Sequence, residues 1–447
     1  MTSTALHPVP ELPEELRPAL TASEALVEAD RCLACSGPYS PAPCAVACPA
    51  GIDVAGFISQ IAAGDPEGAA KTIFAENLLG ATCSRVCPVE VLCEGACVLA
   101  HGGRKPIAIG ALQRYATDRA LALGEPPMRS PVPQAIVRRV VVIGAGPAGM
   151  ACAGELAALG HRVTVFDEHD EPGGLVRYAI APYREQRDPL PAEAAALERL
   201  GVEFRLGTPS TAPEARAAIA EADAVFLGVG LGPDSDVSFP RDELPGVWNS
   251  LPFIEALKTG EAPHVGRDVV VIGGGNTAID VAREALRLGA DRVTMIYRRT
   301  RAEMPAYSHE IDEADSEGVR FSWLSDPVRF IGEHRLEAVE CRLMRLGDPD
   351  ESGRRRPEPI PGSEFVLQAD TAVKAIGQRP RTEVTEWVDG IEFDHGALRI
   401  DPATGRTSNP RFFAGGDVAN GGSSVVEAVA EGKRAAASID RWLSCAS

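Results

Sequence analysis

The chain alternates between continuous apolar runs and segments in which apolar residues recur at helical spacing. Residues 138–144 (RRVVVIG) and 267–273 (RDVVVIG) are rich in β-branched side chains, which is typical of strands buried on both faces of a sheet. Each run leads into a glycine-rich turn, a helical pattern and a second apolar run, at 161–168 and 291–299 respectively. The pattern therefore predicts two βαβ units of one design, 129 residues apart.

The first 125 residues follow a different pattern, without a convincing strand. Apolar residues at helical spacing predict helices over 21–33 and 106–123, and a series of short helices over 51–80. A proline-rich stretch at 125–133 is typical of a stiff linker. We therefore expect an all-α domain to precede the βαβ units.

Sequence typical of strands returns near the C-terminus. Residues 369–378 (ADTAVKAIGQ) echo 222–232 (ADAVFLGVGLG), and the two stretches flank the second βαβ unit. The simplest organisation is an α/β chain in which the N-terminal all-α domain is followed by two interleaved Rossmann-like domains. The expected boundaries are 1–125 for the helical domain, 134–262 and 365–447 for the two segments of the first Rossmann-like domain, and 263–364 for the inserted domain.

The turn of the first βαβ unit has the chemistry of a dinucleotide-binding site. Gly144 permits a tight turn, Gly146 lets a pyrophosphate approach the backbone, and Gly149 lets the helix pack on the strand. The helix N-terminus offers free N–H groups, and Asp167 ends the second strand, where a carboxylate accepts hydrogen bonds from ribose hydroxyls. A glycine turn without a ligand is the alternative, but it does not explain why strand, turn, helix, second strand and acid follow one another in this order. The expected contacts are Gly144, Gly146, Pro147, Ala148, Gly149 and Asp167.

Two further segments indicate which dinucleotide binds there. Residues 171–175 (EPGGL) follow the acid closely, and 415–417 (GGD) precede a predicted helix that begins near Ser424. This combination resembles the FAD-binding half of two-dinucleotide flavoproteins. The resemblance implies that Asp417 binds the ribityl chain and that the helix dipole stabilises negative charge on the flavin. An Asx-turn is the alternative role for Asp417. The further FAD contacts expected are Gly174, Leu175, Gly416, Asp417, Ser424 and Val425.

The second βαβ unit carries a related motif, G-x-G-x-x-A. Aligning the two units places Tyr297 where Asp167 stands, so the ribose-binding acid is missing and two arginines follow. Arginine at this place pairs with a 2′-phosphate, which favours NADPH over NADH, whereas a solvated basic turn is the alternative. The expected NAD(P)H contacts are Gly273, Gly274, Gly275, Asn276, Thr277, Ala278, Arg298 and Arg299, with Arg301 as a further candidate.

Charge and hydropathy limit the partners. The chain has 63 acidic and 44 basic residues, and its net charge of −19 repels phosphate backbones, so we expect no nucleic-acid partner. No apolar run approaches the roughly 18 residues that span a bilayer, and the acidic N-terminus lacks the features of a secretory signal. We therefore expect a cytoplasmic protein without membrane contact, in which disulfides are disfavoured.

Eight of the eleven cysteines precede residue 98, in the spacing C-x2-C-x8-C-x3-C-P and C-x3-C-P-x4-C-x3-C. This spacing resembles the bacterial ferredoxin run C-x2-C-x2-C-x3-C-P, whose thiolates hold iron–sulfur clusters. Zinc is the alternative, although zinc sites usually come as two similar C-x2–4-C knuckles. The flavoprotein context favours clusters, because they carry electrons.

Four stretches identify a family: RCLAC, PCAVACPAGIDV, AAKTIFAENLLGATCSRVCPVEVLCEGAC and IGALQRYATD. They resemble the N-terminal half of dihydropyrimidine dehydrogenase, the flavin subunit of its bacterial two-subunit form and, less closely, the glutamate synthase small subunit, and the resemblance covers about 22–440. It implies two [4Fe–4S] clusters and leaves Cys83 without a role. One cluster would bind Cys32, Cys35, Cys44 and Cys97, and the other Cys48, Cys87, Cys93 and Gln113. Gln113 as a surface helix residue is the alternative.

The resemblance implies an electron-input subunit. NAD(P)H would reduce FAD, and single electrons would leave through the two clusters to a partner in a hetero-oligomer. Arg184 would lie near the flavin, unless it is a surface residue in a run with Arg187. The implied reaction is pyrimidine reduction with a partner that carries an FMN-binding (β/α)8 barrel, which we expect this chain to lack because its last predicted helix ends near Trp442. The alternatives are a glutamate synthase small subunit serving a large subunit, and a non-catalytic zinc-binding scaffold.

Overall fold

The computed structural model of the chain describes residues 17–35, 37, 40–124, 126–132, 136–185, 188–350 and 353–445. These residues form two compact units. The larger unit holds 17–180, 184–232 and 380–445, and the smaller unit holds 181–183 and 233–379, in each case within the described ranges. A membrane-spanning helix is not found in this part of the chain.

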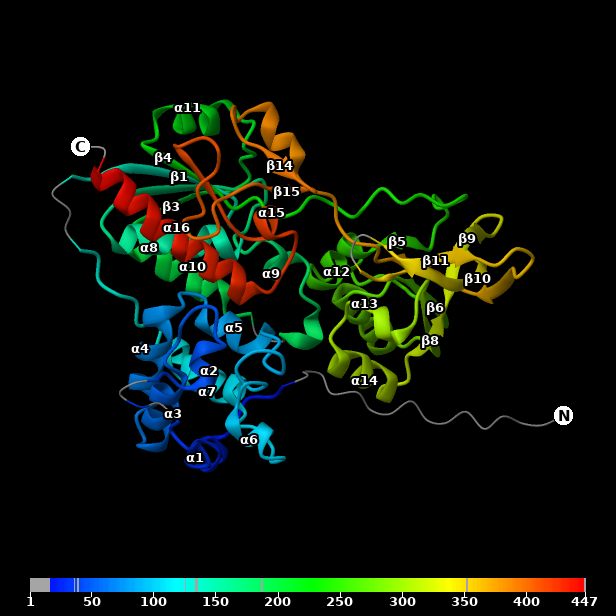
Figure 1. Ribbon diagram of the computed structural model, residues 1–447, viewed down its shortest axis with the longest axis horizontal. Helices are drawn as coiled ribbons and strands as arrows, with labels where there is room; N and C mark the ends of the chain where they lie inside the picture. Colours follow the sequence, from blue (N-terminus) through cyan, green and yellow to red (C-terminus); the bar gives the residue numbers. More distant parts are fainter. Residues whose placement is uncertain are drawn as a thin grey trace. The chain divides into compact units, whose positions relative to one another are not determined.

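The larger unit begins with a helical domain, drawn in blue in Figure 1. Its helices are α1 (Ala22–Asp30), α2 (Pro43–Val46), α3 (Val54–Ala62), α4 (Pro66–Glu76), α5 (Gly80–Val86), α6 (Val98–His101) and α7 (Ile109–Ala122). Three of these helices begin after a residue type that favours the N-cap position. The side chains of Thr21, Asp53 and Asp65 each accept a hydrogen bond from the backbone N–H three residues later. Phe57 and Phe74 lie fully buried in the core. The predicted all-α domain is confirmed.

A five-stranded parallel sheet follows in the same unit, in the order β16-β4-β1-β2-β3. The strands are β1 (Arg139–Ile143), β2 (Arg162–Phe166), β3 (Val202–Arg205), β4 (Ala224–Leu227) and β16 (Phe412–Ala414). The other elements are α8 (Pro147–Ala158), α9 (Leu175–Tyr178), α10 (Leu190–Arg199), α11 (Pro213–Glu221), a 3-10 turn at Thr382–Glu386, β14 (Phe393–Asp394), β15 (Ala397–Leu398), α15 (Asp417–Asn420) and α16 (Val425–Cys445). This sheet is the scaffold of the first dinucleotide turn.

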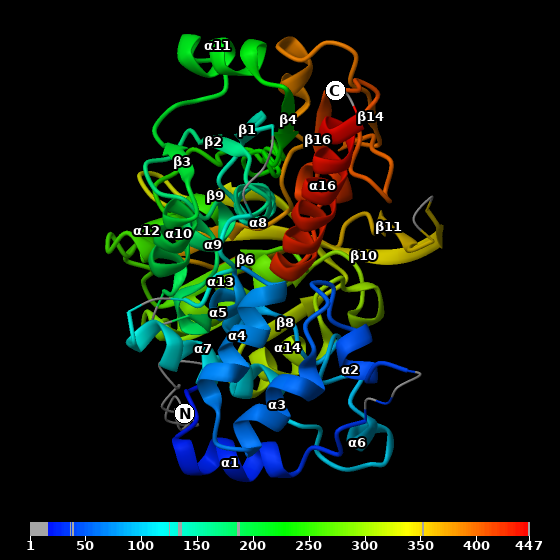
Figure 2. The same ribbon diagram turned by 90° about the vertical axis from the view of Figure 1, so that its left-hand side faces the viewer.

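The C-terminal helix α16 joins this sheet to the helical domain. It packs closely along α8, and a Cβ on Gly432 would lie only 2.1 Å from the Ala148 carbonyl oxygen. Figure 2 shows α16 extending from the sheet to the helical domain. Its first turn enters the helical core through Val426, whereas Leu443 near its end packs on the sheet. The two domains therefore share a continuous helix.

The smaller unit holds a second parallel sheet, in the order β5-β13-β6-β7-β8. Its strands are β5 (Val247–Asn249), β6 (Asp268–Ile272), β7 (Arg292–Tyr297), β8 (Arg320–Trp323) and β13 (Thr371–Lys374), and its helices are α12 (Ser250–Lys258), α13 (Asn276–Arg287) and α14 (Ser308–Ser316). Each sheet has its glycine turn at the carboxyl end of a central strand, β1 or β6, where the strand order reverses and dinucleotides bind. The predicted α/β class with two Rossmann-like domains is confirmed.

The smaller unit also contains an antiparallel sheet that the sequence analysis does not anticipate. The long strand β10 (Ala338–Pro349) pairs with β9 (Ser325–Ile331), β11 (Arg355–Pro359) and β12 (Phe365–Gln368). Its strands carry many charged side chains, so their apolar alternation is weak, and the pairing depends on tertiary contacts.

The smaller unit extends beyond the inserted domain expected at 263–364. Strand β13 pairs with β6, and β5 pairs with β13, although the expected boundaries assign both strands to the first Rossmann-like domain. The reason is the internal repeat: β4 pairs with β1 just as β13 pairs with β6. The echoing stretches are equivalent strands of two separate sheets.

Candidate functional site

The turn between β1 and α8 requires glycine at two positions for steric reasons. Gly144 has φ +101°, and a Cβ there would lie 2.3 Å from the Gly228 carbonyl oxygen. A Cβ on Gly149 would lie 1.9 Å from the Gly144 carbonyl oxygen, so the helix can cross the strand only with glycine at this point. These contacts give the first and third glycines of the motif the roles predicted from sequence.

The middle glycine has a different surrounding. A Cβ on Gly146 would have a single neighbour within 4 Å, the Cα of Gly174 at 3.9 Å. Gly174 has φ +54°, and a Cβ there would approach the Cα of Gly146 to 3.0 Å, while Gly416, with φ +77°, faces Ala148 in the same way at 2.9 Å. Three backbone segments thus approach one another closely beside the α8 N-terminus and form a cradle in which Gly146 has space around it. Such a cradle fits a pyrophosphate.

Asp167 directly follows β2 and faces the same turn. Its Oδ2 accepts a hydrogen bond from the Ala145 N–H at 2.7 Å, and its Oδ1 accepts from the His169 N–H at 2.9 Å. Burial opposes ionisation, but the hydrogen bonds from His169 and Ala145 outweigh it and lower the pKa of the Asp167 carboxyl. The group is therefore an ionised acceptor beside the cradle, as ribose hydroxyls require.

Asp417 and the start of α16 approach the cradle from the C-terminal segment. The Asp417 Oδ1 accepts from the Ser423 N–H, six residues later, at 3.1 Å, so this bond is not an Asx-turn contact, which would reach the backbone two residues on. Burial raises the pKa of Asp417. Ser424 and Glu427 form a capping pair, because the Ser424 N–H donates to Glu427 Oε2 at 3.1 Å. Val425 is the first residue of α16.

The β6–α13 turn in the smaller unit repeats this geometry. Gly273 has φ +145°, and its Cβ would lie 2.1 Å from the Ala375 carbonyl oxygen, whereas Gly275 has open space around it. The Tyr297 ring covers Gly274, where a Cβ would meet the ring at 2.5 Å, and its hydroxyl donates to the Glu303 carbonyl at 2.8 Å. Tyr297 therefore supports the turn instead of replacing the acid chemically. Asn276 and Thr277 open α13, and Ala278 is fully buried.

The two arginines predicted to read a 2′-phosphate have different surroundings. Arg299 is only 4% exposed, and its guanidinium donates to Asp350 at 2.7 Å and to the Arg355 carbonyl at 2.8 Å. Arg298 is exposed and has no hydrogen-bond or ion-pair partner among the described residues. Arg301 pairs with Asp312 at 2.6 Å. Arg299 thus holds the antiparallel sheet, and Arg298 is the arginine that faces solvent.

Four cysteines of the helical domain surround one cavity. Cys32, Cys35, Cys44 and Cys97 line a small hollow together with apolar side chains. Burial raises the pKa of Cys32, and raises that of Cys44 to about 11, and the neighbouring thiols add repulsion between their charged forms. Thiolates gathered in this way become favourable when a metal group neutralises them, so this donor set fits a cluster.

A second group contains Cys48, Cys83, Cys87 and Cys93. The side-chain hydrogen bond with Cys83, burial, and the charges of Cys83, Cys93 and Cys48 together raise the pKa of Cys87 well above its ordinary value. No group of three or more His, Cys, Asp or Glu side chains in the described ranges is arranged to hold a single metal ion.

Cys83 is the residue that the sequence analysis leaves without a role. It lies on α5 four residues before Cys87, the C-cap of that helix, and the two thiols are hydrogen-bonded, so the i, i+4 spacing is the signal that could have found it. Gln113, the predicted ligand, lies on α7 and is only 9% exposed, so it is not a surface residue. Its Nε2 donates to the Gly80 carbonyl at 2.7 Å. Gln113 therefore contacts α5, the helix that carries Cys83.

Arg184, predicted near the flavin, is half-buried at the end of a 3-10 turn, Pro182–Arg184. Its neighbour Arg187 lies outside the described residues. The role of Arg184 stays a prediction.

Comparison with known proteins decides the family. A family model described as pyridine nucleotide-disulphide oxidoreductase matches residues 138–432, which include both glycine turns and both parallel sheets. The chain belongs to this family. A second model, described as dihydropyrimidine dehydrogenase domain II, 4Fe-4S cluster, matches residues 11–125 of the oxidoreductase. The two matches together account for the domains described above.

Relatives of the oxidoreductase extend over nearly the whole chain. It is 38% identical to the small chain of glutamate synthase [NADPH] from Halomonas elongata, over 94% of this chain and 91% of that one. It is 38% identical to the beta subunit of NADP(+)-dependent formate dehydrogenase from Moorella thermoacetica, over 91% of this chain and 60% of that one. FprA of Mycobacterium tuberculosis in complex with NADPH is similar in fold, with a TM-score of 0.56 and 20% identity over 69% of this chain and 84% of that chain.

The cofactors of the oxidoreductase follow from the two family matches. They are FAD, NADP and [4Fe–4S], as the sequence predicts. The relatives that match nearly the whole chain include glutamate synthase small chains and an NADP(+)-dependent formate dehydrogenase subunit, so they support the glutamate synthase alternative better than pyrimidine reduction. The cluster family also argues against a zinc-binding scaffold.

Proposed function

We propose that the oxidoreductase is the electron-input subunit of a larger complex, in which electrons from NADPH pass by way of FAD and two [4Fe–4S] clusters to a partner. One observation carries the proposal: the first dinucleotide turn and both cysteine groups belong to one compact unit, joined by α16. When bound, FAD accepts two electrons from NADPH and can release them one at a time, and the clusters carry single electrons.

The residues of the chain bind and orient these groups. The α8 N-terminus and Gly146 would hold the FAD pyrophosphate, Asp167 the ribose and Asp417 the ribityl chain. The α13 N-terminus, beside Gly275, would hold the NADPH pyrophosphate. Leu175, close to the cradle, would border the FAD. The proposed cluster ligands are Cys32, Cys35, Cys44 and Cys97 for one cluster, and Cys48, Cys87 and Cys93 with Gln113 or Cys83 for the other.

The partner favoured by the comparisons is a glutamate synthase large subunit. The relative from Halomonas elongata matches over nearly the full length of both chains, which supports the same division of labour. A partner with an FMN barrel that reduces pyrimidines is the weaker candidate, since its support is the description of the cysteine domain family.

The proposal is tested by anaerobic purification followed by reconstitution. The chain should carry flavin and iron and should oxidise NADPH with an artificial acceptor. Mixed with a glutamate synthase large subunit, it should support NADPH-dependent glutamate formation; mixed with an FMN-barrel subunit, it should not reduce uracil. Uracil reduction would reverse the choice of partner, and a colourless zinc protein would refute electron input altogether.

The nucleotide preference should depend on Arg298. Arg298→Ala should weaken NADPH binding about tenfold or more, because one charge-assisted pair with the 2′-phosphate is lost, and should leave NADH binding nearly unchanged. Titration of both nucleotides measures this, with Arg329→Ala, which changes an exposed arginine of the antiparallel sheet, as the control. Arg299→Ala should instead lower thermal stability, since it leaves Asp350 without its buried arginine partner. Equal losses for both nucleotides in Arg298→Ala would show that this arginine does not read the phosphate.

The fourth ligand of the second cluster can be assigned by comparing two variants. Gln113→Ala should lower the iron content from about eight to about four atoms per chain if Gln113 is the ligand, because one cluster is lost and the other is spared. Cys83→Ser should do the same if Cys83 is the ligand. Iron analysis and electron paramagnetic resonance of the reduced protein distinguish them. Full iron content in both variants would remove both residues from the ligand set.

A further inference from the structure

A buried carboxylate connects the flavin-binding domain to the cysteine helix α5. Glu193 on α10 is 0% exposed, yet its side chain reaches the start of α5, 112 residues earlier in the chain. Its Oε1 accepts from the Ala81 N–H at 2.8 Å and from the Thr82 N–H at 3.3 Å, and the Thr82 hydroxyl donates to its Oε2 at 2.6 Å. Helix α5 has no cap of its own, because Leu79 occupies the N-cap position. Glu193 supplies the missing cap from another domain.

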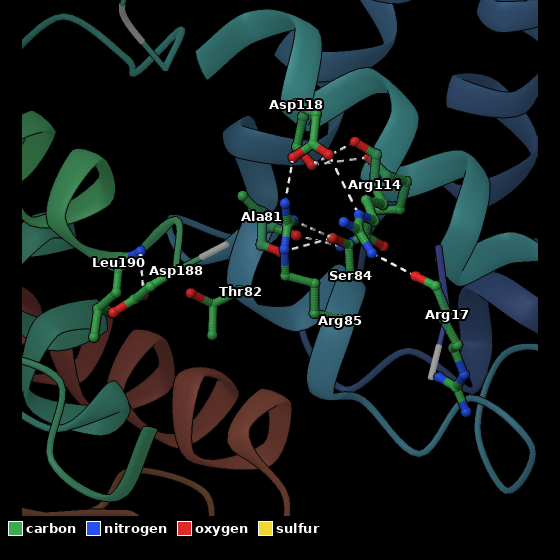
Figure 3. Close-up of polar contacts among 12 residues, drawn as sticks. Arg17, Ala81, Thr82, Ser84, Arg85, Arg114, Asp118, Asp188 and Leu190 are labelled. Atoms are coloured by element: carbon green, nitrogen blue, oxygen red, sulfur yellow. Dashed lines mark hydrogen bonds and ion pairs between the residues drawn. The ribbon is translucent and has the colours of Figure 1, made fainter. Parts of the chain in front are cut away.

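The same helix carries Cys83, ends at its C-cap Cys87, and is also held by a charged pair. Arg85, with a side chain only 2% exposed, pairs with Asp118 of α7 at 2.5 Å and donates to the Ala81 carbonyl at 3.1 Å. Figure 3 shows Arg85 and Arg114 converging on Asp118. Asp118 thus fixes α5 within the helical domain, and Glu193 fixes it to the flavin-binding domain.

We propose that Glu193 is a positioning residue for electron transfer: by capping α5 it sets the place of the second cysteine group relative to the FAD turn. This inference rests on the proposed function. Glu193 can hold the start of α5 in place because it lies on the helix α10, and because both of its carboxylate oxygens bind groups of α5. A change at this residue should alter the path of the electrons without touching the flavin.

The carboxyl can keep these contacts in either charge state. Burial raises the pKa of Glu193 to about 7, against the hydrogen bonds from Thr82 and Ala81 and the charge of Arg85, which lower it. When protonated, Oε2 donates to the Thr82 hydroxyl while Oε1 still accepts from the two amides. Glutamine reproduces this neutral form, so Glu193→Gln should retain the cap and Glu193→Ala should lose it.

A second contact between the same domains provides a matched control. Lys433 of α16 donates to the carbonyl oxygens of Ala50 and Glu76, at 3.2 and 3.0 Å, and pairs with the Glu76 carboxylate. It therefore joins the helical and flavin-binding domains without contacting α5. Lys433→Met should loosen the domains to a similar degree while leaving the α5 cap in place.

The experiment compares the full-length holoprotein with Glu193→Ala, Glu193→Gln and Lys433→Met. Hydrogen exchange should show the Ala81 and Thr82 amides exchanging about fivefold faster or more in Glu193→Ala alone, as expected for the loss of a buried cap. Stopped-flow mixing with NADPH should show an unchanged rate of flavin reduction in all variants. The following step, in which electrons leave the flavin for the clusters, should be slowed about tenfold in Glu193→Ala and restored in Glu193→Gln.

A pH series of melting temperatures supplies a further readout. The folded protein binds a proton at Glu193 up to about pH 7, whereas the unfolded chain releases it near pH 4.5, so ionisation costs stability as pH rises between these values. Glutamine does not ionise, so Glu193→Gln does not lose stability in this way. It should therefore melt above the wild type at pH 8, with the difference closing toward pH 4.5.

The outcomes separate this inference from the proposed function. If the wild type reduces its flavin but never its clusters, the electron-input proposal fails. If the wild type transfers electrons normally and Glu193→Ala transfers them at the same rate, the positioning role fails, whatever happens to amide exchange. If Glu193→Ala does not fold, Glu193→Gln and a Thr82→Val variant, which removes only the hydroxyl contact, decide the matter: unchanged exchange and unchanged transfer in Thr82→Val would overturn the proposal.

Discussion

Cys87→Ser should abolish electron delivery from NADPH to a partner subunit while leaving NADPH oxidation by an artificial acceptor largely intact. Cys87 lies at the centre of the second group, where Cys48, Cys83 and Cys93 all act on its thiol. A serine hydroxyl is a poor ligand for iron compared with a thiolate, so the cluster should be lost. Partner-dependent turnover should fall to background, about 100-fold or more, because it requires the clusters.

The measurement pairs two assays on one protein preparation. Partner-dependent turnover reports the path through the clusters, and reduction of an artificial acceptor reports the flavin alone. Cys445→Ser is the matched control, since this exposed cysteine lies at the end of α16, outside both groups. Coupled turnover that survives in Cys87→Ser would remove the second cluster from the electron path.

Gly146→Val should remove FAD from a protein that still folds. A Cβ at this position has only the Cα of Gly174, at 3.9 Å, as a neighbour, and the backbone has φ −73°, so the fold should tolerate the added side chain. The same side chain would occupy the cradle in which the pyrophosphate lies. Bound flavin should fall from about one per chain to about one-tenth or less, with loss of all NADPH oxidation.

The repeated turn offers an internal control for this experiment. Gly275→Val places the same side chain at the equivalent turn of the smaller unit, which also has open space around it. It should abolish NADPH binding and keep the flavin. Gly149→Val should differ from both, because its Cβ would lie 1.9 Å from the Gly144 carbonyl oxygen and should disturb the fold itself. Retention of flavin in Gly146→Val would place the pyrophosphate elsewhere.

The local features of both dinucleotide turns could be predicted from sequence because short-range sterics determine them. Gly144 and Gly273 need positive φ, and Gly149 and Ala278 lie where the helix crosses its strand, so the residue types alone indicate the geometry. The buried parallel strands were equally plain from their unbroken apolar runs. The all-α character of the first domain followed from helical spacing in the same way.

The domain boundaries were harder to predict because two similar strands compete for two similar sheets. The stretches that became β4 and β13 have nearly the same sequence pattern, and nothing local says which sheet each one joins. Packing decides it: β13 pairs with β6 and β4 with β1, so each sheet is completed by the strand that follows its own unit. The antiparallel sheet around β10 is also a product of long-range pairing.

The sequence by itself determined the chemistry that the chain can hold: two glycine turns on parallel strands, a basic pair in place of an acid, and eight cysteines in a cluster spacing. Only the tertiary structure decided how individual residues are used. Arg299 pairs with Asp350, 51 residues away, whereas its neighbour Arg298 is exposed to solvent. Glu193 caps a helix 112 residues away. Such partners are distant in sequence, and long-range packing, unlike turn geometry, leaves no local pattern to read.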